Sequence, residues 1–269
     1  MKDKYANLTR DSRDHALNDF SYWFPKVKDC GMHVPPSVVV KTPQHLIDNG
    51  TFCLDNNAKD TADIQAWVDG EIIPAIKSAG LEYLPLFVKN ASFSGKFDAN
   101  ENCFAMKENL TEHIKSIMYN DLSVGVDGFS EIVIRQRIRF NPKTTPCIYN
   151  GLPLRPEFRV FYDFDEKSVI FVANYWAYAY CFDGLFFLTD QIIFNHMRGE
   201  LERVFAEYKD FVAQKVAWHM KNVSGLSGAW SVDIMFADYP QPGEEDPTMF
   251  LIDMAVAEKS AYWELRPLF

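Results

Sequence analysis

Two apolar segments, Trp230-Ser-Val-Asp-Ile-Met-Phe236 and Phe250-Leu-Ile-Asp-Met-Ala255, each carry one aspartate. Apolar residues that alternate around a single acid are typical of a strand, and we expect Asp233 and Asp253 to share the inward face of such strands. The intervening Asp238-Tyr-Pro-Gln-Pro-Gly-Glu-Glu-Asp-Pro247 is rich in proline and glycine and predicts a turn. A hairpin of this kind would bring the two carboxylates close together.

Two neighbouring carboxylates repel each other unless a cation or a proton lies between them. Oxygen ligands of this kind suit Mg²⁺, which proteins hold with one or two carboxylates and substrate phosphates. Acids are also common on half-exposed strands, so a hairpin with two solvated aspartates is an equally good interpretation of the pattern.

The composition is that of a folded, acidic protein. Of the 269 residues, 48% are hydrophobic and 15% are aromatic, which argues against disorder. The 27 Lys and Arg residues against 37 Asp and Glu give a net charge of −10, which disfavours a general nucleic-acid surface. Charges interrupt the apolar stretches well short of a membrane span, and the first residues lack the apolar core of a signal peptide.

The five cysteines are scattered and form no metal-binding pair: Cys30, Cys53, Cys103, Cys147 and Cys181. An odd number without paired spacing argues against a disulfide framework, so the sequence predicts a cytoplasmic protein with small, buried thiols. We find no phosphate-binding glycine loop of the Walker type, no nucleophile elbow and no zinc-protease motif.

The rest of the chain predicts a mixture of helices and strands. Periodicity and capping residues predict helices over residues 8–28, 42–50, 60–80, 108–120 and 191–220. Apolar runs predict strands over 34–41, 84–89 and 131–138, and a hairpin over 156–163 and 168–175. Hairpins mixed with helices indicate an α+β fold. We expect two closely joined lobes, over 1–130 and 131–269.

Lysines end two of the predicted strands, in Val38-Val-Val-Lys41 and Phe87-Val-Lys89. A lysine at a strand end is usually solvated, and this is the ordinary interpretation of each. Lys89 differs because Ser94-Gly95-Lys96 follows it closely. A small, flexible loop lets backbone N–H groups approach phosphate oxygens while lysines supply point charges.

Charged residues also mark two later strands. Arg135, Arg137 and Arg139 alternate, as the solvated face of a strand would. Glu157 and Arg159 share a strand face and would also be explained by a structural ion pair between them.

In their order along the chain, these residues resemble the ATP-grasp superfamily over residues 20 to 264. The matching stretches are Val38-Val-Val-Lys41, Phe87-Val-Lys89, Ser94-Gly95-Lys96, Ile132-Val-Ile-Arg-Gln-Arg-Ile138, Pro156-Glu-Phe-Arg-Val160, Val232-Asp233 and Leu251-Ile-Asp253. The resemblance implies an α+β ATP-grasp fold with nucleotide between two α+β lobes, and ATP and Mg²⁺ as cofactors.

The resemblance also implies roles for the residues that contact the phosphates. Lys41 and Lys89 would bind them, with Lys89 contributing to catalysis. Ser94, Gly95 and Lys96 would form a mobile loop over them.

Further roles follow from the same resemblance. Gln136, Arg137 and Ile138 would form the adenine hinge through their backbone. Glu157 would accept hydrogen bonds from the ribose hydroxyls.

The remaining roles concern the metal and the transferred phosphoryl group. Arg159 would face the γ-phosphate or the acceptor, and Asp233 and Asp253 would hold Mg²⁺. Most members of the superfamily carry Asn two residues after the second acid, where this chain has Ala255. Glu258 would be the substitute ligand if the chain turned it back. We therefore expect one firmly bound Mg²⁺ and a second bound weakly or not at all.

One branch of the superfamily is especially similar to this chain, the eukaryotic cell-division-cycle family that assembles translation initiation factor two. The similarity lies in Phe20-Ser-Tyr-Trp-Phe-Pro-Lys-Val27, in Lys89 with Lys96, and in Glu157-Phe-Arg159.

Three functions are compatible with the resemblance. The first is an ATP-dependent carboxylate–amine ligase that acts through an acyl phosphate on a peptide or amino-acid-like substrate. The second is an ATP-binding assembly chaperone without ligase turnover, which would bind a protein. The third is a degenerate grasp module that only binds a partner.

Overall fold

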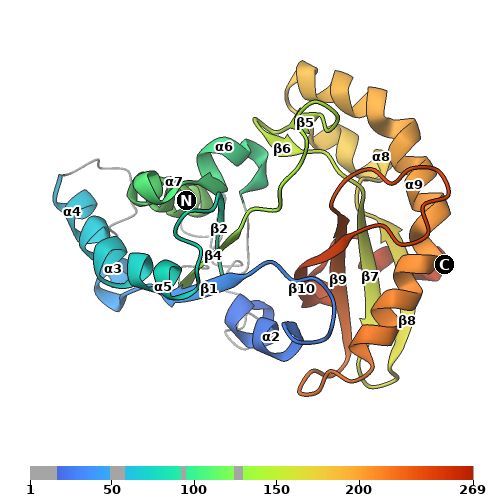
Figure 1. Cartoon of the computed structure of the whole chain (residues 1–269), viewed down its shortest axis with the longest axis horizontal. Coiled ribbons are helices and arrows are strands. Elements are labelled where there is room, and N and C mark those ends of the chain that lie inside the picture. The colour runs from blue at the N-terminus through green and yellow to red at the C-terminus, as the bar shows by residue number, and fades with distance from the viewer. Residues whose placement is uncertain (1–16, 49–57, 92–94, 124–129, 269) are drawn as a thin grey trace, which may run out of the picture. The chain divides into compact units, whose positions relative to one another are not determined.

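The computed structural model describes residues 17–48, 58–91, 95–123 and 130–268, and the chain divides into two compact units (Figure 1). Unit 1 comprises Met1–Ser21, Pro36–Arg137 and Asn150–Leu152. Unit 2 comprises Tyr22–Pro35, Ile138–Tyr149 and Pro153–Phe269. The division into functional lobes over 1–130 and 131–269 remains a prediction.

Unit 1 is built on a four-stranded antiparallel sheet in the order β1-β4-β2-β3. Its strands are β1 (Ser37–Lys41), β4 (Glu131–Gln136), β2 (Leu86–Asn90) and β3 (Phe104–Ala105). The strand predicted over 131–138 therefore ends two residues early. Side chains alternate between the faces of a strand, so Val40, Val88 and Ile134 lie on the face that joins the apolar core.

Helices supply the other half of the core of unit 1. They are α3 (Gln44–Asp48), α4 (Ala58–Trp67), α5 (Ile73–Ser78), α6 (Ala99–Asn102) and α7 (Leu110–Ser123). A π-helical turn (Val68–Ile72) joins α4 to α5, so the single helix predicted over 60–80 contains one widened turn. Ile64, Ile76 and Ile114 are completely buried in this core, and each such side chain contributes about 1.5–3 kcal/mol of hydrophobic stabilisation.

Unit 2 contains a second four-stranded antiparallel sheet, in the order β10-β9-β7-β8. Its strands are β7 (Glu157–Asp163), β8 (Ser168–Asn174), β9 (Ala229–Phe236) and β10 (Met249–Val256). The predicted hairpins are therefore confirmed, including the one that carries the two aspartates. The register of β10 against β9 shifts between Leu251 and Asp253, which marks a β-bulge at Ile252.

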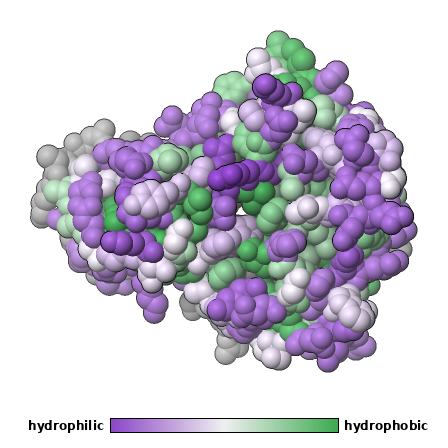
Figure 2. Space-filling model, in the orientation of Figure 1, coloured by the Kyte–Doolittle hydropathy of each residue, from purple (hydrophilic) through white to green (hydrophobic). Residues whose placement is uncertain are grey.

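The long helix α9 (Leu188–Met220) covers one face of the sheet in unit 2 (Figure 1). Its buried residues recur at helical spacing, and include Leu201, Val204, Tyr208, Val212 and Val216. Aromatic rings fill the interface, since Phe158 lies 5.7 Å from Phe205 and Phe236 lies 5.5 Å from Tyr208, centroid to centroid. The outer side of α9 is mostly hydrophilic (Figure 2).

The remaining elements are short. They are α2 (Phe20–Val27), α8 (Tyr178–Cys181), β5 (Cys147–Ile148) and β6 (Leu152–Pro153), together with 3-10 turns at Lys96–Asp98, Lys107–Asn109, Phe182–Gly184, Ala257–Lys259 and Trp263–Leu268. The antiparallel sheets and the helices packed on them confirm the predicted α+β class. Among the described residues, no helix is both long and apolar enough to span a membrane.

Candidate functional site

Three predicted site residues form one row across the sheet of unit 2. Arg159 on β7 is the register partner of Asp233 on β9, and Asp233 is the partner of Asp253 on β10. Register partners share a sheet face, so all three side chains lie on the face opposite to α9. We call Arg159, Asp233 and Asp253 the acid row.

The bulge at Ile252 places Asp253 in this row. In unbroken register, the pairing of Leu251 with Ile234 would put Asp253 opposite Val232, on the face that α9 covers. The extra residue moves Asp253 to the polar face instead. β-Bulges re-aim side chains in this way and are common beside functional sites.

Arg159 binds Asp233 through a two-pronged ion pair. Its Nε donates to Asp233 Oδ1 at 2.8 Å and its Nη2 donates to Asp233 Oδ2 at 2.7 Å. The two side chains are only 13% and 6% exposed. Burial alone would lower the pKa of Arg159, but the Asp233 carboxylate outweighs it and holds the pKa above its usual value. The guanidinium therefore stays charged.

The next row on the same face contains Ala255 and Ser231, which are register partners. The Ser231 hydroxyl lies 2.6 Å from the Ser260 hydroxyl and donates to the Ala255 carbonyl at 3.3 Å. Glu258 lies beyond the end of β10, in the turn Ala257–Lys259, and is exposed. The hydroxyl of Ser231, rather than the carboxylate of Glu258, is therefore the polar group beside Ala255.

Glu157 lies on the same face, two residues before Arg159 on β7. It is buried, and its carbonyl accepts a hydrogen bond from the Tyr175 N–H at 3.1 Å. The structure thus gathers Glu157, Arg159, Asp233 and Asp253 on one face of one sheet.

The donor set of the acid row fits one Mg²⁺. Each carboxylate oxygen has two lone pairs, so the fork of Arg159 leaves Asp233 able to accept further ligands. Asp253 Oδ1 accepts from the Met254 N–H at 3.0 Å. Within the described part of the chain, no group of three or more His, Cys, Asp or Glu side chains is placed to hold a metal ion. Two carboxylates that need phosphate oxygens to complete the shell are a typical Mg²⁺ arrangement.

The sheet of unit 1 has a polar face of its own, opposite to its core. Lys89, Glu131 and Arg135 lie there and are all nearly buried, at 2%, 4% and 6% exposed. Phe20 covers them, with Lys89 Nζ 5.9 Å and Arg135 Cζ 5.8 Å from its ring centroid. The Ser21 N–H donates to Glu131 Oε1 at 3.0 Å. The interpretation of Arg135 as a solvated residue is therefore wrong.

Lys41 lies on this polar face too, because its register partner is Glu131. It is exposed, as a lysine at a strand end usually is, whereas Lys89 is not. Gly95 is buried and precedes the 3-10 turn that begins with the half-buried Lys96. Ser94 lies outside the described residues. Lys41 and Lys89 therefore share a face, and Lys96 follows β2 in the same unit.

The predicted hinge lies where the chain leaves unit 1. The Gln136 N–H donates to the Pro36 carbonyl at 2.9 Å, and the Arg137 N–H donates to the Pro85 carbonyl at 2.8 Å. Arg137 also stacks on Phe104, 3.5 Å from its ring centroid. Ile138 is the first residue of the chain's return to unit 2.

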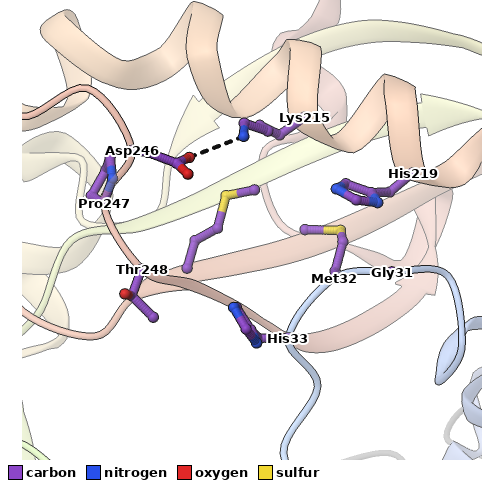
Figure 3. A pocket seen from close by; sticks show the side chains of 9 residues that line it. Gly31, Met32, His33, Lys215, His219, Asp246, Pro247 and Thr248 are labelled. Atoms are coloured by element: carbon purple, nitrogen blue, oxygen red, sulfur yellow. Dashed lines mark hydrogen bonds and ion pairs between the residues drawn. The ribbon is translucent and has the colours of Figure 1, made fainter.

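A pocket of about 220 Å³ in unit 2 contains none of the predicted site residues (Figure 3). Lys215 and Asp246 on its wall form an ion pair at 3.0 Å. His219 Nδ1 lies 3.1 Å from the Cys30 carbonyl. Gly31 is required there, since its φ is +94° and a Cβ would lie 2.9 Å from His219 Nδ1. Because its charged groups satisfy each other, we assign this pocket no chemistry.

Sequence reasoning missed two kinds of residue. The even spacing of Glu131 and Arg135 indicates that they share a strand face, but no sequence pattern indicates that Phe20 covers Arg135 there. The sequence also carried no signal for Ser231, Ser260 and Tyr175, because their contacts join segments that are far apart in the chain.

No protein-family model matches the chain, and no curated protein matches it. Solved structures do align with it. They include the VanG D-Ala:D-Ser ligase from Enterococcus faecalis (15% identity, 90% of this chain and 53% of that one, TM-score 0.43). A D-alanine–D-alanine ligase from Bacillus anthracis complexed with ATP aligns at 11% identity (90% and 54%, TM-score 0.39). An ATP-grasp RimK domain protein from Sphaerobacter thermophilus aligns at 10% identity (98% and 65%, TM-score 0.38).

The chain spans between about half and two thirds of the length of these solved structures. Two of them are named as ligases and one as an ATP-grasp protein. At TM-scores below 0.5, the assignment of this chain rests on its own residues.

Proposed function

We propose that this chain is an ATP-grasp protein that binds Mg-ATP and acts as an ATP-dependent carboxylate–amine ligase on a peptide or amino-acid-like substrate. The observation that supports it most is the placement of Glu157, Arg159, Asp233 and Asp253 on one sheet face, in adjacent register rows. Glu157 and Arg159 share a face because they are two residues apart, and by chance Asp233 and Asp253 would both join them in about one case in four.

The lysines of unit 1 bind the phosphates in this proposal. Lys89 is the stronger candidate, because a cation that is only 2% exposed gains more from an anionic ligand than a solvated one does. Lys41 adds a second positive charge on the same face. Ser94, Gly95 and Lys96 cover the phosphates.

The other contacts hold the nucleoside. The backbone of Gln136, Arg137 and Ile138 receives the adenine. Glu157 accepts hydrogen bonds from the ribose hydroxyls, which its burial would strengthen.

The reaction needs no side-chain nucleophile. An oxygen of the substrate carboxylate attacks the γ-phosphorus, the bond to the ADP oxygen breaks, and an acyl phosphate forms. The nitrogen of an amine then attacks the acyl carbon, phosphate leaves, and the amine proton passes to solvent. Lys89 and Arg159 would position the phosphoryl oxygens and oppose their developing charge. Bound Mg²⁺ would add charge neutralisation at the same oxygens.

The test is ADP release. The purified chain is incubated with Mg-ATP and pools of amino acids or peptides, and a ligase should release ADP and phosphate only when an acceptor pool is present. Lys89→Ala and Asp253→Ala should lose ATP binding, whereas Lys77→Ala, on the exposed end of α5, should keep it. ATP binding that is unchanged in both site variants would reject the ATP-grasp assignment.

A second candidate is an ATP-binding assembly chaperone, as in the cell-division-cycle family that assembles translation initiation factor two. Ala255 favours it, because alanine cannot coordinate a metal, and a protein that only binds ATP depends less on a complete metal shell than one that transfers the phosphoryl group. A chaperone would bind ATP without acceptor-dependent turnover and would retain one defined protein in its presence. Mg²⁺ titration into the ATP complex should then find one tight site, and two tight sites would contradict the expectation from Ala255.

A further inference from the structure

The Asp233 carboxylate already holds a cation, namely the guanidinium of Arg159. Both carboxylate oxygens accept hydrogen bonds from it, at 2.8 and 2.7 Å. We propose that Arg159 is the resident cation of the acid row and makes divalent-metal binding by Asp233 and Asp253 depend on nucleotide. The inference rests on the proposed ATP site and adds a role for Arg159 before any reaction begins.

The charges of the acid row support this role. Arg159, Asp233 and Asp253 together carry a net charge of −1. A divalent ion added to them would leave a net charge of +1 and would lie close to a guanidinium that stays charged, in a partly dry place where like charges repel strongly. Without Arg159, the same carboxylates would carry −2 and would attract a divalent ion directly. The arginine therefore opposes a metal ion that arrives alone.

Contacts outside the acid row fix Arg159 in this position. Its Nη1 donates to the Ala261 carbonyl at 3.4 Å, and its Cζ lies 4.9 Å from the ring centroid of Tyr175. Tyr262 donates to the Tyr175 carbonyl at 2.7 Å and has a φ of +76°, which a tyrosine adopts only where neighbouring contacts hold it. The C-terminal turn therefore supports the paired position of the guanidinium.

A nucleotide would offer Arg159 a second partner. Phosphate oxygens match the guanidinium fork as well as a carboxylate does. Phosphates also bring the negative charge that a divalent ion needs in order to lie beside an arginine. Nucleotide and metal should therefore bind this face together, and neither a metal ion alone nor a second metal ion should bind tightly.

Mn²⁺ binding to the full chain tests the inference without any measurement of activity. The electron paramagnetic resonance signal of free Mn²⁺ reports the bound fraction, with and without ATP. The wild-type chain should bind Mn²⁺ weakly alone and at least about tenfold more tightly with ATP. Arg159→Met keeps the length of the side chain and removes its charge, and should bind Mn²⁺ at least about tenfold more tightly than wild type without nucleotide. Its melting temperature should rise as Mn²⁺ is added.

Matched variants test whether the gain in Mn²⁺ affinity is specific to Arg159 or follows from the loss of any positive charge. Lys215→Met removes a cation from the exposed pair with Asp246 and should create no Mn²⁺ site. Asp233→Asn combined with Arg159→Met should abolish the gain. Arg159→Lys keeps the charge but loses the fork, and covers the case in which Arg159→Met does not fold. It should bind Mn²⁺ with an affinity between those of wild type and Arg159→Met.

The outcomes distinguish this inference from the proposed function. Tight Mn²⁺ binding by the wild-type chain without nucleotide, equal to that of the Arg159 variants, would overturn the role of Arg159. Failure of the wild-type chain to bind ATP would reject the proposed function, and a gain of Mn²⁺ binding in Arg159→Met would still support Arg159 as the resident cation. Equal affinity with and without ATP, in a chain that does bind ATP, would overturn the dependence on nucleotide.

Discussion

The sheets of the two units share a plan but neutralise their charges differently. Each sheet packs one face on helices and turns charged residues to the other. In unit 1, the aromatic ring of Phe20 covers Lys89 and Arg135. In unit 2, Arg159 donates a hydrogen bond to each carboxylate oxygen of Asp233. The comparison teaches that unit 2 holds its arginine with a carboxylate across the sheet, whereas unit 1 holds two cations beneath an aromatic ring.

The largest expected effect concerns the pair that unit 2 satisfies internally. Asp233→Asn keeps the shape of the side chain but leaves the guanidinium of Arg159 without its carboxylate. Breaking a buried ion pair on one side costs about 3–5 kcal/mol, so the free energy of unfolding in urea should fall by that amount. A loss no greater than that of Asp246→Asn, which breaks an exposed pair, would show that the buried pair of Arg159 and Asp233 contributes no more to stability than an exposed one.

The next effect concerns the cations of unit 1. Lys89→Met should weaken ATP binding by about 10- to 100-fold, because a hydrogen bond to a charged group contributes about 1.5–3 kcal/mol. Lys41→Met, which removes an exposed lysine from the same face, should weaken it less. Isothermal titration with Mg-ATP measures both variants. Equal losses would remove the distinction between the covered cation and the solvated one.

A smaller effect concerns the C-terminal turn that supports Arg159. Burial, with Cys181 close by, raises the pKa of Tyr262 well above its usual value, and burial raises that of Tyr239 as well. In the unfolded chain a tyrosine has a pKa near 10. Below pH 10 each side chain is therefore neutral in both states, and its contribution to the free energy of unfolding does not change with pH. Above pH 10 the unfolded chain loses the phenolic proton while the folded chain keeps it, so each tyrosine should lower the free energy of unfolding by up to about 1.4 kcal/mol per pH unit.

Tyr262→Phe isolates the contribution of this tyrosine. The variant loses the hydrogen bond to the Tyr175 carbonyl, which should lower the free energy of unfolding at pH 8 by about 1 kcal/mol. Its stability should then fall less steeply than that of wild type between pH 10 and 11, measured by urea unfolding. Parallel curves for the two proteins would contradict the raised pKa.

The smallest effect serves as the reference for the others. Lys215 and Asp246 form an ion pair whose side chains are 38% and 75% exposed. Lys215→Met should change the free energy of unfolding by no more than about 1 kcal/mol, and by less at high salt. A larger change would mean that exposed pairs in this protein contribute as much as the buried pair of the acid row.

Local sequence patterns predicted most of the helices and strands, and which side chains share a face of each. The alternation around Asp233 and Asp253 predicted the hairpin, and the helical spacing over 191–220 predicted nearly all of α9. The pairing of Arg159 with Asp233 was not predictable, because it joins residues that are 74 apart in the chain. Burial of Arg135 was also missed, since its cover comes from Phe20, which no strand pattern reveals. Long-range partners, rather than local propensity, decide these features.

The bulge at Ile252 makes the chemistry of β10 depend on how the strand pairs with β9 as well as on its residue types. Pairing of β10 with β9 without the bulge would place Ile252 opposite Asp233, turn Asp253 toward α9 and bring Met254 to the polar face. All the acids would still be present in the sequence, yet one carboxylate would lie in an apolar core. Deletion of Ile252, by contrast, would let Leu251 and Asp253 pair with Ile234 and Asp233 without a bulge, and Asp253 would stay on the polar face. The register of β10 against β9 at Leu251 and Asp253 is itself a determinant of the site.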